Sequence, residues 1–102
     1  MTFQNRYVLK GKSKHWIYNG GCEYDCEFHY GKVEWHHPIS KDGMVGVYLC
    51  EAHHSLIYGR KHGLPGETIV KKSYDQMRSE IQALVIERIK ERGYTEDDID
   101  KN

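Results

Sequence analysis

Any fold of this chain has to account for two short pairs of metal-binding residue types, Cys22-x3-Cys26 and Cys50-x2-His53, which a longer stretch separates. Two ligands three or four residues apart can bind one ion from a single turn, and two such pairs commonly supply a closed tetrahedral zinc site. We therefore expect Cys22, Cys26, Cys50 and His53 to form a structural Cys3His zinc site. The alternative is three ordinary buried thiols, which the polar neighbours of these cysteines argue against. Those neighbours are Glu23, Asp25, Glu27 and Glu51.

The length and composition of the chain also favour a metal. With 102 residues it is short enough to be a single domain, 1–102, and chains of this size bury only a modest fraction of their surface. Hydrophobic residues make up 38% of the sequence, so the core must be small. Structural zinc contributes about 10–16 kcal/mol of apparent binding energy in small modules. Three cysteines is an odd number, which fits metal binding better than a disulfide framework.

Histidines form a second group in the same stretch. His36 and His37 end a strand-like run over residues 32–35, and His54 directly follows the zinc candidate His53. A zinc ion bound at His53 would therefore bring His54 close to the end of that strand. Histidines assembled in this way can hold a catalytic divalent metal and still leave one imidazole free to act as a base. The alternative is that they are surface histidines or satisfied core histidines.

The order of these elements resembles an HNH endonuclease with a zinc-bound ββα-metal core. The matching elements are C-x3-C, then V-E-W-H-H-P, then a glycine-containing loop, and then V-Y-L-C-E-A-H-H. They cover about residues 20–62, roughly two fifths of the chain. Several spaced elements in the right order are more specific than a lone His-His pair. The resemblance is to small proteins of the phage or mobile-element type.

The resemblance implies a metal-dependent DNA endonuclease. By position, it makes His36 and His54 ligands of the catalytic metal and His37 the general base that activates water. His53 stands where many members of the family have a fourth zinc cysteine. The implied cofactors are a structural Zn²⁺ and a catalytic Mg²⁺ or Mn²⁺, with Ni²⁺ or Zn²⁺ as alternatives at the catalytic position. His62, eight residues beyond His54, is a candidate third ligand.

One position departs from the family pattern. The family's middle asparagine is absent, since Val45, Gly46 and Val47 stand where it would lie. That residue usually supports the loop or orients the base, so its absence leaves the fold prediction intact but keeps a second hypothesis open. In that hypothesis the chain is a non-catalytic, zinc-containing module that binds nucleic acid or protein. A third hypothesis is a purely structural zinc domain within a larger assembly.

Residues outside the two motif groups complete a predicted α+β fold. Turn signals and apolar runs predict N-terminal strands over 3–9 and 15–18, then strands over 32–37 and 45–49 and a helix over 51–60. Between them, residues 22–31 form the first zinc loop, where the spacing of His29 indicates no role.

The clearest helix spans about residues 73–92. Ser73 with Gln76 makes a capping-box pattern at its start, and Gly93 is well placed as its C-terminal cap. Its apolar residues recur at helical spacing and predict a face that covers the core or pairs with a second protomer. They are Met77, Ile81, Leu84, Val85 and Ile89. The acidic tail, residues 94–102, is expected to fray.

Charge gives a weak indication of a partner. The formal net charge is zero, so bulk attraction to nucleic acid is not indicated. Residues 1–72 nevertheless hold ten Lys and Arg against seven Asp and Glu, whereas residues 73–102 hold five against eight. Basic side chains beside the proposed site suit contact with DNA phosphates, although charged residues are often only a solvated surface. The candidate DNA contacts are Lys41, Arg60 and Lys61.

No signal peptide and no run of about 18 apolar residues is evident. We therefore expect an intracellular, cytoplasmic protein that acts in a host cell if it is phage-encoded, without membrane contact. It would bind DNA as a monomer, or as a homodimer through the helix over 73–92.

Overall fold

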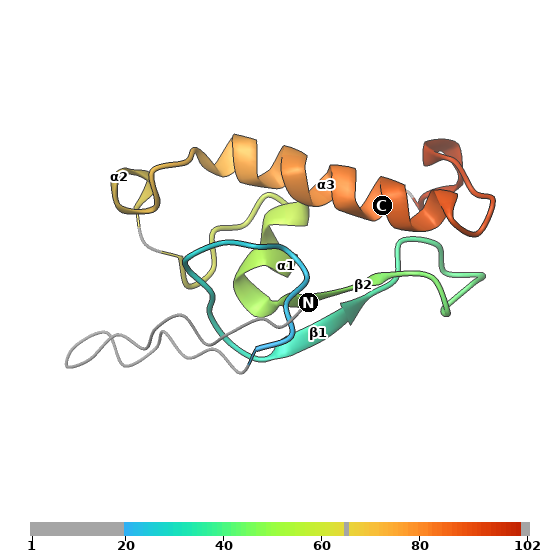
Figure 1. Cartoon of the computed structure of the whole chain (residues 1–102), viewed down its shortest axis with the longest axis horizontal. Helices are drawn as coiled ribbons and strands as arrows, with labels where there is room; N and C mark the ends of the chain where they lie inside the picture. Colours follow the sequence, from blue (N-terminus) through green and yellow to red (C-terminus); the bar gives the residue numbers. More distant parts are fainter. Residues whose placement is uncertain (1–19, 65, 101–102) are drawn as a thin grey trace.

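The chain forms a small α+β fold in which a two-stranded hairpin and two main helices surround one core (Figure 1). The computed structural model describes residues 20–64 and 66–100. Strand β1 (Val33–His36) pairs antiparallel with β2 (Val47–Cys50), and helix α1 (Glu51–Ile57) follows β2 directly. This is the predicted strand–strand–helix order, with boundaries that differ by a few residues. The predicted N-terminal strands over 3–9 and 15–18 lie outside the described residues.

The register of the hairpin decides which side chains can reach α1. Glu34 is opposite Leu49, and His36 is opposite Val47. Because side chains alternate between the two faces of a strand, Glu34 and His36 share one face. That face is the one where α1 supplies His54, which contacts both residues. On the other face Trp35 packs against Tyr48, with ring centroids 4.7 Å apart.

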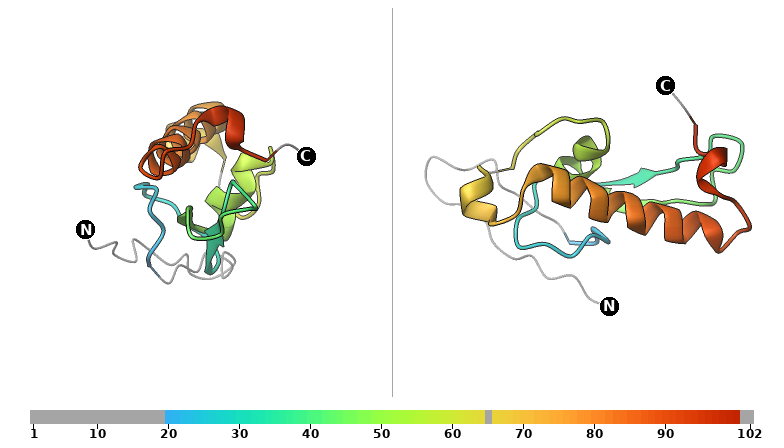
Figure 2. Two further views of the ribbon diagram at one scale, coloured as in Figure 1. Left: turned by 90° about the vertical axis from the view of Figure 1, so that its right-hand side faces the viewer. Right: turned by 90° about the horizontal axis from the view of Figure 1, so that it is seen from above.

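Helix α3 (Tyr74–Lys90) confirms the clearest prediction from the sequence. Ser73 caps it, since its side chain accepts a hydrogen bond of 3.0 Å from the backbone N–H of Gln76. Helix α3 lies over α1 and β2 (Figures 1 and 2), and four of its residues at intervals of four are buried on one stripe. They are Met77, Ile81, Val85 and Ile89. The stripe thus covers the chain's own core, and pairing of two protomers through α3 stays a prediction.

Arg88 of α3 ties this helix to the two segments that lead to the site. Its Nη1 donates a hydrogen bond of 2.8 Å to the carbonyl of Gly46, just before β2. Its guanidinium also forms an ion pair with Glu23, next to Cys22. Both partners are less than one third exposed, so this link is shielded from solvent better than an ordinary surface pair.

The expectation of a frayed tail is wrong for residues 94–100. A short 3-10 helix, η2 (Glu96–Asp98), follows α3, and Thr95 and Asp98 form a reciprocal capping box at its N-terminal end. The backbone N–H of Asp100 donates to the carbonyl of Pro38 at 2.8 Å, and its carboxylate accepts from the backbone N–H of Ser40 at 2.9 Å. The tail therefore folds back beside the loop between the strands (Figure 2), because tertiary partners satisfy its backbone.

A single helical turn, α2 (Glu67–Val70), lies between α1 and α3 and was not predicted from the sequence.

Within residues 20–64 and 66–100, none of the helices combines the length and the apolar character needed to cross a bilayer.

Candidate metal centre and histidine site

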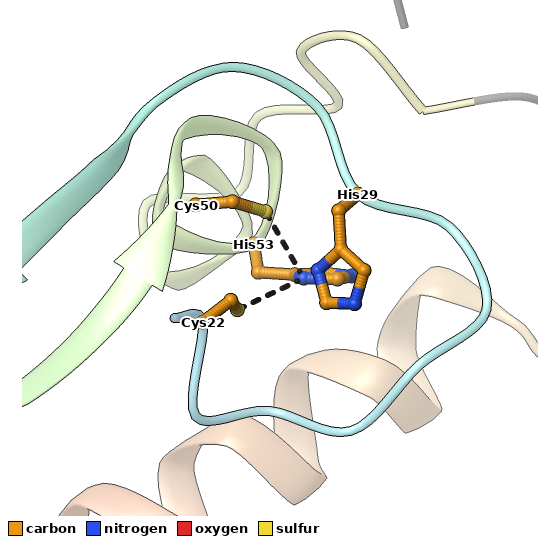
Figure 3. Close-up of side chains that lie close together, drawn as sticks. All are labelled: Cys22, His29, Cys50 and His53. Carbon is orange, nitrogen blue, oxygen red and sulfur yellow. Dashed lines mark hydrogen bonds between the residues drawn. The ribbon is translucent and has the colours of Figure 1, made fainter. Parts of the chain in front are cut away.

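Four buried side chains meet where the first loop faces the junction of β2 and α1 (Figure 3). Cys22 and His29 come from the loop, Cys50 ends β2, and His53 lies in the first turn of α1. One potential ligand atom from each residue lies within 4.8 Å of the others. Cys22, Cys50 and His53 have no exposed surface, and His29 is 3% exposed.

The spacing of these atoms suits a tetrahedral zinc ion. Nδ1 of His53 lies 3.2 Å from the sulfur of Cys50 and 3.6 Å from that of Cys22. Zinc bonds of about 2.3 Å to sulfur and about 2.0–2.1 Å to nitrogen place neighbouring ligands about 3.5 Å apart at tetrahedral angles. A small inward movement of the four side chains would therefore complete a Cys2His2 site.

The electrostatics of the cluster also favour a cation. Burial opposes ionisation of Cys50, but hydrogen bonds from Cys22, His29 and His53 lower its pKa to about 2. The hydrogen bond to Cys50, together with burial, raises the pKa of Cys22. Burial alone would lower the pKa of His53, yet interactions with the sulfur atoms of Cys26 and Cys50 raise it to about 9. The proton on His53 thus compensates the negative charge of the buried Cys50 thiolate. A divalent metal ion can replace that proton.

The observed group differs from the predicted one in a single member. Cys22, Cys50 and His53 were predicted, but His29 stands in the group and Cys26 does not. The prediction assumed that Cys22 and Cys26 bind from one turn, whereas the loop over residues 21–30 has no helix or strand. An irregular loop has no period that relates spacing to direction. His29 could have been noticed only as a further metal-binding residue type on the same loop.

Beside this cluster, His36 of β1 and His54 of α1 point their rings at each other. Nδ1 of His36 lies 3.2 Å from Nε2 of His54, and Nδ1 of His54 lies 2.7 Å from a carboxylate oxygen of Glu34. Two nitrogens bound to one ion at about 2.1 Å lie about 3.0–3.4 Å apart at octahedral or tetrahedral angles. The predicted approach of His54 to the end of the strand is therefore present, with a separation that suits two ligands of one ion.

His36 and His37 have different environments although they are adjacent. His36 is 8% exposed, and burial, helped by the neighbouring His54 and His37, lowers its pKa to about 4. Its ring is therefore neutral at pH 7, as a metal ligand must be. His37, the predicted general base, is exposed, so water can reach its ring.

His54 lines an open groove of about 340 Å³. Its lining residues are Glu34, Glu51, His54, Ser55, Tyr58, Arg60 and His62. His62 shares the groove with His54, but its Nε2 lies 3.7 Å from a carboxylate oxygen of Glu51 and its ring packs on Tyr30. Over residues 20–64 and 66–100, the buried cluster is the one compact group of three or more His, Cys, Asp or Glu ligands. His62 thus does not form such a group with His36 and His54.

The three predicted DNA contacts are spread over different surfaces. Arg60 lines the groove at His54. Lys41 lies over the ring of Tyr94 at 5.8 Å, and Lys61 lies over that of Tyr74 at 5.0 Å. Of these side chains, Arg60 is therefore the one placed beside the histidine pair.

Two sites thus stand side by side, a buried Cys/His cluster and a histidine pair at an open groove. They meet on α1, where His53 belongs to the first and His54 to the second. The donor set of the cluster makes zinc binding plausible. Comparison of this chain with protein-family models, with curated proteins and with solved structures found no match.

Proposed function

We propose that the protein is a metal-dependent DNA endonuclease of the HNH type. In this proposal the buried cluster holds a structural Zn²⁺, and His36 and His54 hold a catalytic Mg²⁺ or Mn²⁺. The observation that carries it is the 3.2 Å separation between Nδ1 of His36 and Nε2 of His54. A strand and a helix contribute one imidazole each, and an exposed third imidazole, His37, follows at the next residue. These are the parts that a single-metal phosphodiester hydrolysis requires.

His37 acts on water in this mechanism. A ring nitrogen of His37 takes a proton from water, the water oxygen forms a bond to phosphorus, and the bond from phosphorus to the 3′ oxygen breaks. A divalent ion bound at His36 and His54 would supply stabilisation of the negative charge on the phosphate and the leaving oxygen. His36, neutral and buried, and His54, open to the groove, would hold that ion beside the substrate.

Glu34 supports this arrangement from behind His54. Its carboxylate oxygen lies 2.7 Å from Nδ1 of His54. An ionised carboxylate has no proton to donate, so it acts as the acceptor of this hydrogen bond. It therefore favours the tautomer with the proton on Nδ1, which leaves the lone pair of Nε2 directed towards His36. Carboxylates commonly orient metal-binding histidines in this way.

A plasmid-nicking assay with Mg²⁺ or Mn²⁺ tests the proposal. We expect the wild-type protein to convert supercoiled DNA to the nicked or linear form, and chelation of the catalytic metal to stop it. His37→Ala should reduce the rate by about 10²–10⁴, the usual loss for a general base. Met44→Ala, at a side chain that is 78% exposed in the loop before β2, is the matched surface control. Undiminished cleavage by His37→Ala would refute the assignment of the base.

The alternative is a non-catalytic module that binds DNA, and one observation favours it. In the described part of the chain no third ligand forms a compact group with His36 and His54. Such a module would retain DNA in a gel-shift assay with affinity that falls steeply as salt rises. It would show no cleavage with any divalent metal, and His37→Ala would change nothing.

A further inference from the structure

Tyr58 is a large aromatic residue that lies half exposed beside the histidine pair. Its ring centroid lies 5.7 Å from that of His54 and 6.3 Å from that of His36. Both imidazole planes are strongly tilted from the plane of Tyr58, by 59° and 82°, so neither imidazole lies flat on it. Tyr58 keeps 52% of its surface exposed. A phosphate bound to a metal ion at the two histidines would therefore lie next to an accessible aromatic ring.

The backbone at the end of α1 fixes the position of Tyr58. Its N–H donates a hydrogen bond of 3.0 Å to the carbonyl of Ser55, and the N–H of Arg60 donates to the same carbonyl at 3.0 Å. Between them, the N–H of Gly59 donates to the carbonyl of Leu56 at 3.0 Å. Gly59 has φ +76°, a left-handed conformation that commonly ends a helix. A hydrogen-bonded turn thus presents the ring, which reduces the conformational entropy that a ligand would have to remove.

The same turn places a cation in the groove. Arg60 lines the groove together with Tyr58 and His54. A guanidinium binds phosphate oxygens, and an aromatic ring stacks on the face of any nucleobase. These two contacts are the ones by which proteins bind the backbone and the bases of a single strand. The groove therefore combines both of them with the proposed metal position.

Two carboxylates line the groove as well, and both have partners. Glu34 contacts Nδ1 of His54 at 2.7 Å. Glu51 accepts a hydrogen bond of 3.0 Å from the backbone N–H of Lys32. A divalent ion at the histidine pair would balance the negative charge of these two groups, because a bound cation is often the largest charge in a site. With Arg60 added, the groove would then attract a phosphate backbone.

We propose that Tyr58 stacks on an unpaired nucleobase next to the phosphate that is cut, while Arg60 contacts the neighbouring phosphate. The preferred substrate is then single-stranded or locally unpaired DNA, since a base within a duplex is already stacked between its neighbours. Stacking tolerates any base, so Tyr58 selects for strandedness and not for sequence. This inference rests on the proposed function, in which Tyr58 neither binds the metal nor transfers a proton.

Binding of labelled DNA to full-length variants provides the first test. The His37→Ala background removes the proposed base, so fluorescence anisotropy with Mn²⁺ can report affinity without cleavage. In that background, Tyr58→Leu should weaken single-strand binding by about 5- to 150-fold, the usual loss of a stacking ring, and should change duplex binding little. Tyr58→Phe keeps the ring and should bind like its parent. Undiminished binding by Tyr58→Leu, or an equal loss in Tyr58→Phe, would overturn the proposal.

Tyr48 provides a matched control. It is 50% exposed, but it packs against Trp35 on the other face of the hairpin. Tyr48→Leu should leave both affinities unchanged, and a loss equal to that of Tyr58→Leu would argue against a specific stacking contact. Titration with Mn²⁺, followed by electron paramagnetic resonance, separates stacking from a structural role. Tyr58→Leu should retain the parent's Mn²⁺ affinity, and a parallel loss would mean that the ring only positions the histidines.

Ultraviolet cross-linking tests the contact in the unmutated protein, without risk of misfolding. A single strand with 5-iodouracil loses iodine on irradiation and becomes joined to an aromatic ring stacked on the base. The cross-link should map to Tyr58, and mapping only to other residues would contradict the proposal. Cleavage of single-stranded and duplex DNA at equal rates would also refute it and leave the endonuclease proposal standing. Single-strand binding with a cross-link at Tyr58 but no cleavage with any divalent metal would support stacking and refute the endonuclease.

Discussion

The Cys/His cluster and the histidine pair are built from the same short segment but differ in access to solvent. The cluster is closed, since Cys22, Cys50 and His53 have no exposed surface. The histidine pair is half open, because His36 is 8% exposed while the side chain of His54 is 20% exposed and lines a groove. Structural metal sites are typically closed, and catalytic ones keep a position open for water or substrate. Under the proposed function, the closed cluster would hold the fold together and the half-open histidine pair would carry out the chemistry.

The two sites diverge within one turn of α1. His53 and His54 are neighbours, and consecutive side chains on a helix point about 100° apart, because a turn holds 3.6 residues. His53 consequently faces the loop with Cys22, and His54 faces β1 with His36. An ion in the cluster would fix the orientation of α1 relative to β1. That orientation sets the distance between the rings of His54 and His36. Loss of the first ion should therefore damage both sites, whereas damage at the second should remain local.

The largest predicted effect comes from removing a ligand of the cluster. Cys50→Ser should abolish zinc binding and prevent stable folding, because structural zinc contributes about 10–16 kcal/mol of apparent binding energy. His54→Ala should keep the zinc and a cooperative thermal transition. Circular dichroism melts together with metal analysis measure both results. If Cys50→Ser melted at the wild-type temperature, the cluster would not be the element that holds the fold.

How much the sequence predicts also differs between the two sites and the rest of the chain. Helix α3 was predicted with its cap because helical spacing of Met77, Ile81 and Val85 is a local signal. The approach of His54 to the end of β1 was also predicted, because zinc binding at the neighbouring His53 would bring His54 there. The choice of His29 over Cys26 was not, because a loop without a repeat gives no rule for side-chain direction.

Two further features were missed because they depend on tertiary contacts. The tail is ordered by hydrogen bonds between Asp100 and residues 38 and 40, which are distant in sequence. The hydrogen bond between Glu34 and His54 likewise depends on how α1 lies over the hairpin. Neither partner can be read from spacing along the chain.

A substitution at Gly46 can disturb the histidine pair indirectly, through the backbone of the hairpin that holds His36. A Cβ atom at this position would lie 2.2 Å from the carbonyl oxygen of His36. Gly46→Ala should therefore push β1 and β2 apart where His36 is held, at a cost of about 1–3 kcal/mol for an overpacked interior. Gly43→Ala is the matched control, because a Cβ atom there meets nothing within 4 Å. Chemical denaturation of both variants measures the difference, and equal stability would mean that the close approach has no energetic consequence.

A smaller and more local effect is expected at Glu34. Glu34→Gln should weaken metal binding at His36 and His54 by about 10–100-fold, the usual loss when a carboxylate that orients a metal-binding histidine is removed. The control is Glu51→Gln, which alters the same groove at a carboxylate that contacts His62 and the backbone of Lys32. Titration of zinc-loaded protein with Mn²⁺, followed by electron paramagnetic resonance, gives the affinities. Identical Mn²⁺ binding in the two variants would show that Glu34 does not position His54.

The smallest effect concerns Asp42, which holds the loop after His37 to the tail. Its carboxylate accepts hydrogen bonds from Tyr94 at 3.0 Å and from Arg92 at 2.9 Å. Burial opposes its ionisation, but these bonds outweigh burial and lower the pKa of Asp42. A carboxyl whose pKa is lower in the folded state stabilises the fold above its unfolded pKa of about 3.9. That contribution disappears as pH falls through the folded pKa.

Asp42→Asn should therefore be less stable than the wild type at neutral pH, and the difference should shrink as pH falls below about 4 towards the lower pKa of the folded carboxyl. Thermal melts of the zinc-loaded proteins from pH 7 downwards would measure it, compared only over the range in which both retain zinc. Because Asp42 lies on the loop and not in either site, zinc content and Mn²⁺ affinity should be unchanged at neutral pH. A change in Mn²⁺ affinity would instead show that the tail controls the open site through this loop, and the division between fold and chemistry would then be less sharp than the geometry indicates.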